Sequence, residues 1–311
     1  MHALMTEQFL TALVLGAITA GVPLLLAGLG EQISEKAGVL NIGIEGMMLC
    51  GAYGGFVVAY YSESFWLGFL AGGLTGMAVA AVMVLLCVLL AMNQIVIGIG
   101  ITLGAEGLTA LLHHFQFSRT YPRLHDAPTM PIPGLSDIPV VGPALFDHHP
   151  VVYLAVVLMF VLVWVFRSTT IGLNLQAAGD KPAALDAAGV SVRVTRAGAV
   201  LTTGFLAGVG GAYMANIGGG LFVPFMTHGG GFIAIVLAML ARGKPVWVGL
   251  GALLFGVSLA LTTALQVAGL NIPTDVVQML PFAMVIVVLI IFARHSYLPA
   301  ALGLPYARGQ R

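Results

Sequence analysis

The sequence predicts an all-α polytopic membrane protein with about nine transmembrane helices. Of its 311 residues 59% are hydrophobic and only 8% are charged, and the mean hydropathy is +1.03. Charged residues make up about a quarter of a typical soluble domain. Several apolar runs also exceed the roughly 20 residues that a helix needs to cross a bilayer. The balance of 12 acidic and 12 basic residues gives no indication of a nucleic-acid partner.

The apolar runs define the expected spans in chain order. The first begins without a preceding lysine or arginine, so we interpret it as a span and not as a cleaved signal peptide. The nine expected spans are residues 9–29, 39–61, 65–92, 95–117, 151–166, 200–217, 232–241, 246–268 and 276–292. A re-entrant second or seventh segment would change the number by one, to between eight and ten.

Polar segments separate the spans. The first two are divided by a polar turn at 30–38, and the third and fourth by a tight turn at 93–94. Residues 118–150 contain seven prolines and are expected to form a loop without long regular elements.

The basic residues predict the orientation. With the stretch 167–199 on the cytoplasmic side, ten of the twelve lie inside and only Arg119 and Arg123 lie outside. The N-terminus is then outside, the loop 118–150 is periplasmic, and the tail 294–311 is cytoplasmic.

A weak internal symmetry divides this single domain, residues 1–311, into two inverted repeats. The first covers about 8–117 and the second about 200–293, with the fifth span and a polar segment, 151–199, between them. Interrupted segments at 38–46 and 229–240 occupy corresponding positions. Broken segments in inverted repeats are typical of transporters and indicate the substrate path.

Two carboxylates inside the expected spans, Glu45 and Glu106, are candidates for function because an intramembrane charge is costly. Asn41 precedes Glu45 by one helical turn, which predicts that both lie on one helix face. The alternative for Glu45 is that it ties neighbouring helices together, and for Glu106 a structural role is favoured. His228 either faces a polar solute or is solvated. No metal site is expected.

Spaced glycines predict close helix packing. The pairs Gly51/Gly55, Gly72/Gly76, Gly100/Gly104 and Gly204/Gly208 have the spacing that lets membrane helices approach closely.

The polar stretch 167–199 predicts a short helix on the cytoplasmic side. Asp180 is expected to cap it, Pro182 to lie in its first turn and Gly189 to end it. Its exposed face would be small, with Ala183, Ala184, Ala187 and Ala188. Such a helix suits docking to a cytoplasmic partner; the alternative is an ordinary connecting loop.

Missing motifs exclude some activities. The chain has no G-x-x-x-x-G-K-[ST] phosphate loop, no nucleophile elbow and no H-E-x-x-H zinc motif. It is therefore not expected to be an enzyme, and any ATP hydrolysis must come from another polypeptide.

Four motifs carry a resemblance to a known family. They lie at 30–48 (GEQISEKAGVLNIGIEGMM), 171–190 (IGLNLQAAGDKPAALDAAGV), 229–245 (GGGFIAIVLAMLARGKP) and 298–309 (LPAALGLPYARG). With these, the chain resembles the permease subunit of bacterial ABC importers in the branched-chain amino acid, ribose and nucleoside group, and within it the nucleoside or simple-sugar branch.

The resemblance implies a coupling helix at about 181–188 that inserts into an ATPase subunit. The implied coupling residues are Asp180, Lys181, Pro182, Ala183, Ala184, Leu185, Asp186, Ala187, Ala188 and Gly189. The family usually has an arginine where this chain has Gln176. The implied partners are a tandem-domain ATPase that binds ATP and Mg, a second and different permease subunit, an extracytoplasmic solute-binding lipoprotein and membrane lipids. The implied location is the bacterial inner membrane, and the implied mechanism is alternating access.

The resemblance favours a nucleoside as the solute, with a simple sugar or a branched-chain amino acid as alternatives. Asn41, Glu45, Phe222, Phe225 and His228 are expected near the path, where they would supply hydrogen bonds and stacking. A rival class is a secondary transporter that works without ATP. Such a carrier is expected to have paired acids in both repeats, and the expected spans of the second half contain none.

Overall fold

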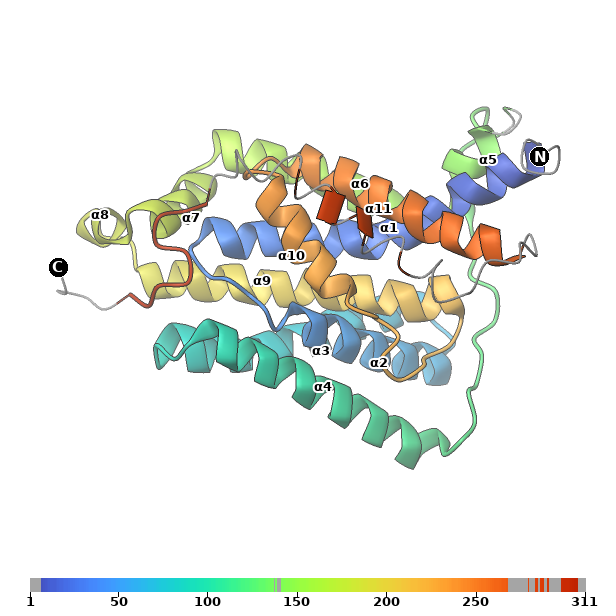
Figure 1. Cartoon of the computed structure of the whole chain (residues 1–311), viewed down its shortest axis with the longest axis horizontal. Coiled ribbons are helices and arrows are strands. Elements are labelled where there is room, and N and C mark those ends of the chain that lie inside the picture. Colours follow the sequence, from blue (N-terminus) through green and yellow to red (C-terminus); the bar gives the residue numbers. More distant parts are fainter. Residues whose placement is uncertain are drawn as a thin grey trace.

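The protein is an elongated bundle of helices that run roughly parallel to one another (Figure 1). The computed structural model describes residues 7–136, 138, 141–267 and 298–306, together with 279, 283, 284, 286, 287 and 290. Residue 7, the first that the structure describes, and α5 (Val141–Phe146) lie at one end, which we call the α5 end. Residue 306, the last described residue, and α8 (Pro182–Ala187) lie at the other, the α8 end.

Long helices build most of the bundle. They are α1 (Glu7–Lys36), α2 (Ile44–Ser62), α3 (Phe65–Met83), α4 (Gln94–Phe117), α6 (Pro150–Ser168), α9 (Val192–Tyr213) and α11 (Pro245–Val267). The shorter helices are α7 (Thr170–Asp180) and α10 (Gly230–Leu240). Two π-helical turns, η2 (Val84–Leu89) and η3 (Met214–Gly219), extend α3 and α9. In the loop before α6, β1 (Met130–Pro131) pairs antiparallel with β2 (Asp147–His148).

Five helices of the described residues are long and apolar enough to cross a membrane: α1, α3 with η2, α4, α6, and α9 with η3. The apolar helices α10 and α11 are shorter in the part searched. The predicted class of a helical protein with several apolar spans is therefore confirmed. The number nine stays a prediction, because most of the ninth expected span, 276–292, lies outside the described residues.

The first helix is longer than predicted. The expected polar turn at 30–38 is wrong, because α1 continues to Lys36 and buries Glu31, Gln32, Ser34 and Glu35 inside the bundle. These side chains are packed against protein, so they do not end the helix as solvated residues would. The chain breaks instead at 37–43, where Gly38 has a φ of +87°, and α2 begins at Ile44 and not at residue 39.

Glycines bring α2, α3 and α9 into backbone contact at the centre of the bundle. A Cβ atom added to Gly208 would overlap the carbonyl oxygen of Gly72 and lie 3.0 Å from the Cα of Gly76. A Cβ on Gly51 would in turn overlap Gly208. The predicted close packing is confirmed for these three helices. It is wrong for Gly100 and Gly104, which have no described atom within 4 Å because α4 lies at the edge of the bundle.

We expect Gly208→Ala to lower the melting temperature, because its Cβ atom meets backbone atoms that have no rotamer freedom. Overpacking of this kind costs about 1–3 kcal/mol. The control is Gly104→Ala, where the added methyl group meets open space and the helix gains about 0.5–1 kcal/mol in propensity. Thermal unfolding of the detergent-solubilised protein measures both. Equal melting temperatures for the two variants would contradict the packing described for α2, α3 and α9.

Candidate functional site

Glu45 caps a helix from the other half of the chain. It is the second residue of α2 and only 3% exposed. Its Oε1 accepts the N–H of Gly229 at 2.8 Å, and its Oε2 accepts the N–H of Gly231 at 2.6 Å. Because α10 begins at Gly230, these N–H groups belong to the start of that helix, which no side chain of its own caps. The carboxylate therefore satisfies donors that lack a partner within the helix and complements the positive end of its dipole.

The glycines at this junction are required by geometry. Gly229 has a φ of +83°, a conformation that other residues rarely adopt. A Cβ atom on Gly231 would lie 2.6 Å from both the Cα and the nitrogen of Glu45. Only glycine at position 231 allows the backbone of α10 to approach α2 this closely.

The break at 37–43 is held by side chains as well. The N–H of Asn41 donates to Oε1 of Glu31 at 3.1 Å, and the N–H of Leu40 donates to Oε1 of Gln94 at 2.8 Å. The expectation that Asn41 shares a helix face with Glu45 is wrong, because α2 begins three residues after Asn41. The side-chain amide of Asn41 instead donates to the sulfur of Met47 at 3.4 Å.

Buried polar atoms without a hydrogen-bond partner mark this region. They include Oε2 of Glu31, Oδ1 of Asn41, both polar side-chain atoms of Gln32 and Oε2 of Glu35. The sequence reasoning missed Glu31 and Glu35 because it assigned them to a solvated turn. The available signal was that Glu31 and Glu35 are four residues apart, which places both carboxylates on one face if the first helix continues past Gly30.

The other predicted path residues lie in the core, in the loop before α10 and on α4. Phe222 is fully buried and packs edge-on against Tyr53, with ring centroids 5.2 Å apart. Phe225 is 50% exposed and His228 is also exposed, both with positive φ in the loop before α10. Glu106 is half-buried on the peripheral helix α4. The structure thus assigns Phe222 to the core and Glu45 to a helix junction, and it leaves the solute contacts of these residues as predictions.

A second candidate site is the short helix α8. Its range matches the predicted 181–188 closely, Pro182 is its first residue, and Gly189 follows it with a φ of +83°. The predicted cap is wrong: Asp180 is the last residue of α7, and Lys181 occupies the cap position without a capping side-chain bond. The predicted small face is confirmed by exposure of Ala183, Ala184, Ala187 and Ala188. Leu185 is buried and anchors the helix.

A small polar cavity of about 30 Å³ lies between the end of α1, α7 and the turn after α10. It has room for a water molecule or two and none for a solute. Its lining contains two acidic and two basic side chains, which balance in formal charge, and two neutral side-chain amides. Its lining residues are Gln32, Glu35, Lys36, Gln176, Asp180, Arg242, Gly243 and Pro299.

Arg196 is a site residue that the sequence reasoning missed. The residue is only 3% exposed, and its guanidinium donates to the carbonyl oxygens of Ala37, Ala178 and Leu304, at 3.1, 3.1 and 2.7 Å. The available signal was its spacing, because Arg196 lies four residues after Val192 and four before Val200, on one helix face with these apolar residues. The described residues contain no group of three His, Cys, Asp or Glu side chains that could hold a metal ion.

Comparison with known proteins identifies the family. The model of the family described as "Branched-chain amino acid transport system / permease component" matches residues 13–289, which is most of the chain. No solved structure shows a significant match.

Individual relatives match over most or all of their length. The putative glucose ABC transporter permease of Haloferax volcanii is 42% identical over 254 residues, which cover 80% of this chain and 76% of the relative. The nucleoside ABC transporter permease of Lactococcus lactis subsp. cremoris is 30% identical over 321 residues, covering all of both chains. The guanosine ABC transporter permease of Bacillus subtilis is 29% identical over 98% of this chain and 99% of the relative.

We expect Glu45→Ala to destabilise the protein by about 2–4 kcal/mol, because it leaves two N–H groups at the start of α10 without an acceptor. Glu106→Ala is the matched control, since its half-buried carboxylate caps no helix among the described residues. Thermal unfolding and limited proteolysis of the loop 220–229 report the effect. If the two variants are equally stable and equally resistant, Glu45 does not hold the junction.

Proposed function

This chain belongs to the family of branched-chain amino acid transport system permease components, and on that basis we propose how it works in transport. It is a membrane permease and a transport subunit, not an enzyme. In our proposal it is the membrane-spanning subunit of an ABC importer in the bacterial inner membrane. A separate ATPase drives alternating access, and ATP and Mg bind to that partner.

The observation that carries this proposal is the exposed face of α8. Four alanines lie outward on a helix that one buried leucine fixes to the bundle. A face without long side chains suits insertion into a cleft of another protein, because ordering it costs almost no side-chain entropy. In this proposal the residues from Asp180 to Gly189 contact the ATPase.

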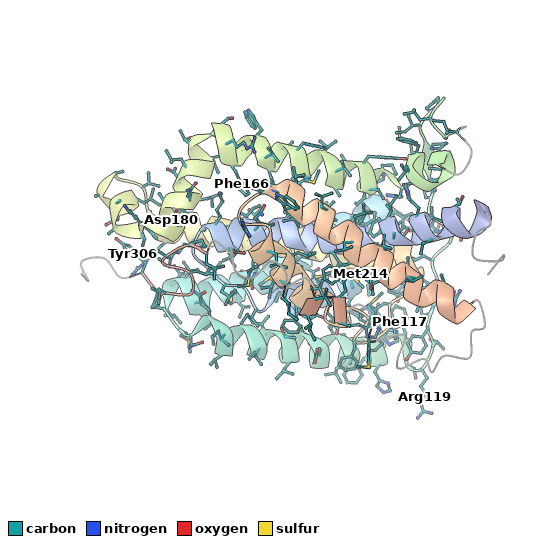
Figure 2. The ribbon with its side chains drawn as sticks, turned by 45° about the horizontal axis from the view of Figure 1, so that its top comes forward. Phe117, Arg119, Phe166, Asp180, Met214 and Tyr306 are labelled. Carbon is teal, nitrogen blue, oxygen red and sulfur yellow. The ribbon has the colours of Figure 1, made fainter. Side chains whose placement is uncertain are left out.

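The distribution of charge supports a cytoplasmic α8 end. Lys36 and Arg242 line the small cavity beside α7, Lys181 directly precedes α8, and Arg196 binds the end of α7. Figure 2 shows Asp180 and Tyr306 at this end and Arg119 at the opposite one. An excess of lysine and arginine is typical of cytoplasmic segments.

We also propose nine spans in two inverted repeats. In each half a long helix, α1 or α9 with η3, leads into an irregular segment and then into the next helix, α2 or α10. The two irregular segments approach each other, because Glu45 at the start of α2 binds the start of α10. In this arrangement the candidates for the solute path remain Asn41, Glu45, Glu106, Phe222, Phe225 and His228.

The partners follow from the same proposal. Lactococcus lactis has two matching relatives described as nucleoside ABC transporter permeases, and Bacillus subtilis has two described as guanosine ABC transporter permeases. Two such chains in one organism support a permease heterodimer. An extracytoplasmic solute-binding lipoprotein would deliver the solute, and membrane lipids would surround the apolar helices.

A nucleoside is the solute that we propose, because relatives described as nucleoside or guanosine permeases match from end to end. A simple sugar is the second candidate, favoured by the 42% identity to a putative glucose permease.

We expect proteoliposomes with the complete importer to accumulate labelled nucleoside only when ATP is present. Excess unlabelled nucleoside is expected to compete at least about ten-fold better than glucose, a difference of about 1.4 kcal/mol. Preferred uptake of glucose would assign the sugar instead. Uptake without ATP would contradict the ABC importer and favour a secondary transporter.

We expect Ala187→Arg to lower co-purification of the ATPase by about ten-fold or more, because a long charged side chain does not fit a cleft shaped for alanine. Val194→Arg is the matched control, since it places the same side chain at a 71% exposed position of α9 near the same end. Both variants are expected to melt like the wild type. Undiminished ATPase binding by Ala187→Arg would remove α8 from the interface.

A further inference from the structure

The C-terminal residues 298–306, which we call the C-terminal strap, run across the α8 end of the bundle (Figure 1). The strap connects two segments that are far apart in the sequence. The N–H of Ala301 donates to the carbonyl of Gly179 in α7 at 2.8 Å, and the N–H of Gly303 donates to the carbonyl of Gly38 at 3.1 Å. One short segment thus bonds to the end of α7 and to the break that follows α1.

The buried side chain of Arg196 binds the same three segments. It donates to Ala37 just beyond α1, to Ala178 near the end of α7, and to Leu304 of the strap. The last carbonyl groups of a helix accept no N–H from within that helix, and they lie at the negative end of its dipole. A guanidinium has five donors in a planar fork, so a single side chain can hold all three segments.

The segments are also in direct backbone contact, which leaves no room for sliding. A Cβ atom on Gly179 would overlap the carbonyl oxygen of Lys36 and lie 3.0 Å from the Cβ of Pro299. A Cβ on Gly38 would lie 3.1 Å from the Cα of Gly179. The end of α7, the end of α1 and the strap therefore form one packed unit.

The helix α8 belongs to this unit. Its only buried apolar side chain, among those that the structure describes, is Leu185, which forms a buried cluster with Ala178 and Val192. Tyr306 of the strap, less deeply buried, packs against this cluster. Figure 2 places Tyr306 beside the end of the molecule where Asp180 leads into α8. A displacement of α8 must therefore move the strap and the end of α7 with it.

We propose that Arg196 and the C-terminal strap transmit the movement of α8 to α1 and the break at 37–43. From there the bond between Asn41 and Glu31 links the break to α1, and α2 follows directly with Glu45 at its start. Arg196 acts as a positioning residue and does not touch the solute. The inference rests on the proposed function, since α8 moves only if an ATPase binds to it.

The first experiment uses the complete importer in proteoliposomes and compares two proline variants. Ala301→Pro removes the N–H that binds Gly179. Ala300→Pro is the control: residue 300 is exposed and occupies the second position of the turn closed by Leu302 N–H and the carbonyl of Pro299, where proline is favoured. A second pair is Arg196→Lys, which loses the fork, with Arg193→Lys at an exposed position as its control.

We expect Ala301→Pro and Arg196→Lys to bind the ATPase and hydrolyse ATP, but to import at least about five-fold less solute per ATP than the controls. A merely structural role for the strap would lower assembly, hydrolysis and import together and leave their ratio unchanged. That unchanged ratio would overturn the proposal. If the wild type neither binds the ATPase nor needs ATP, the proposed function itself fails, which is a different result.

A second experiment leaves the strap intact and so does not depend on the folding of these variants. Spin labels at Ser191→Cys and Ala300→Cys, both exposed, report the distance between the end of α8 and the strap, while Cys50 and Cys87 are buried. Residue 191 lies just after α8 and outside the residues that we propose contact the ATPase. A third label at Leu103→Cys on α4 serves as the reference. On nucleotide binding we expect the distances from Leu103 to both other labels to change together and the distance between positions 191 and 300 to stay constant. Movement of α8 away from a stationary strap would overturn the proposal.

Discussion

The bond between the Glu45 carboxylate and the start of α10 is the interaction on which the arrangement of the helices depends. A helix that begins inside a membrane protein has N–H groups that water does not reach, and each one left unpaired costs several kcal/mol. Glu45 supplies both acceptors from α2. Because one carboxylate binds two N–H groups at fixed spacing, it also fixes where the two halves of the chain meet. The contact also requires glycine at positions 229 and 231, because residue 229 has a positive φ and residue 231 lies against the backbone of Glu45.

At the α8 end the backbone groups that need partners are carbonyl groups, and a basic side chain binds them. There the helices α1 and α7 end inside the protein, and their last carbonyl groups need donors. Arg196 supplies them, together with N–H groups of the strap. Glu45 thus binds the N–H groups at the start of α10, and Arg196 binds carbonyl groups at the ends of α1 and α7. Each also ties together segments that lie far apart in the sequence.

Local patterns in the sequence predicted the elements that local forces decide. Pro182 and Gly189 bound α8, and three of the four glycine pairs lie at close helix contacts, as spacing and backbone freedom require. The turn at 30–38 was wrong because polarity alone does not show that Glu31 and Glu35 are buried by other helices. The contacts of Glu45 with Gly231 and of Arg196 with Leu304 join residues more than 100 positions apart. No local pattern contains such a pairing.

The size of α8 explains why the C-terminal residues matter to it. A helix of six residues is far too short to be stable alone in water, so its shape and position depend on what it packs against. Leu185 gives it one buried contact, and the other side of that contact is formed by α7, α9 and the strap. The sequence marked residues 298–309 as a family motif within a cytoplasmic tail and did not show what they contact. In the folded chain Tyr306 of the strap packs against the cluster that contains Leu185, and in our proposal the strap carries the movement of α8 to α1.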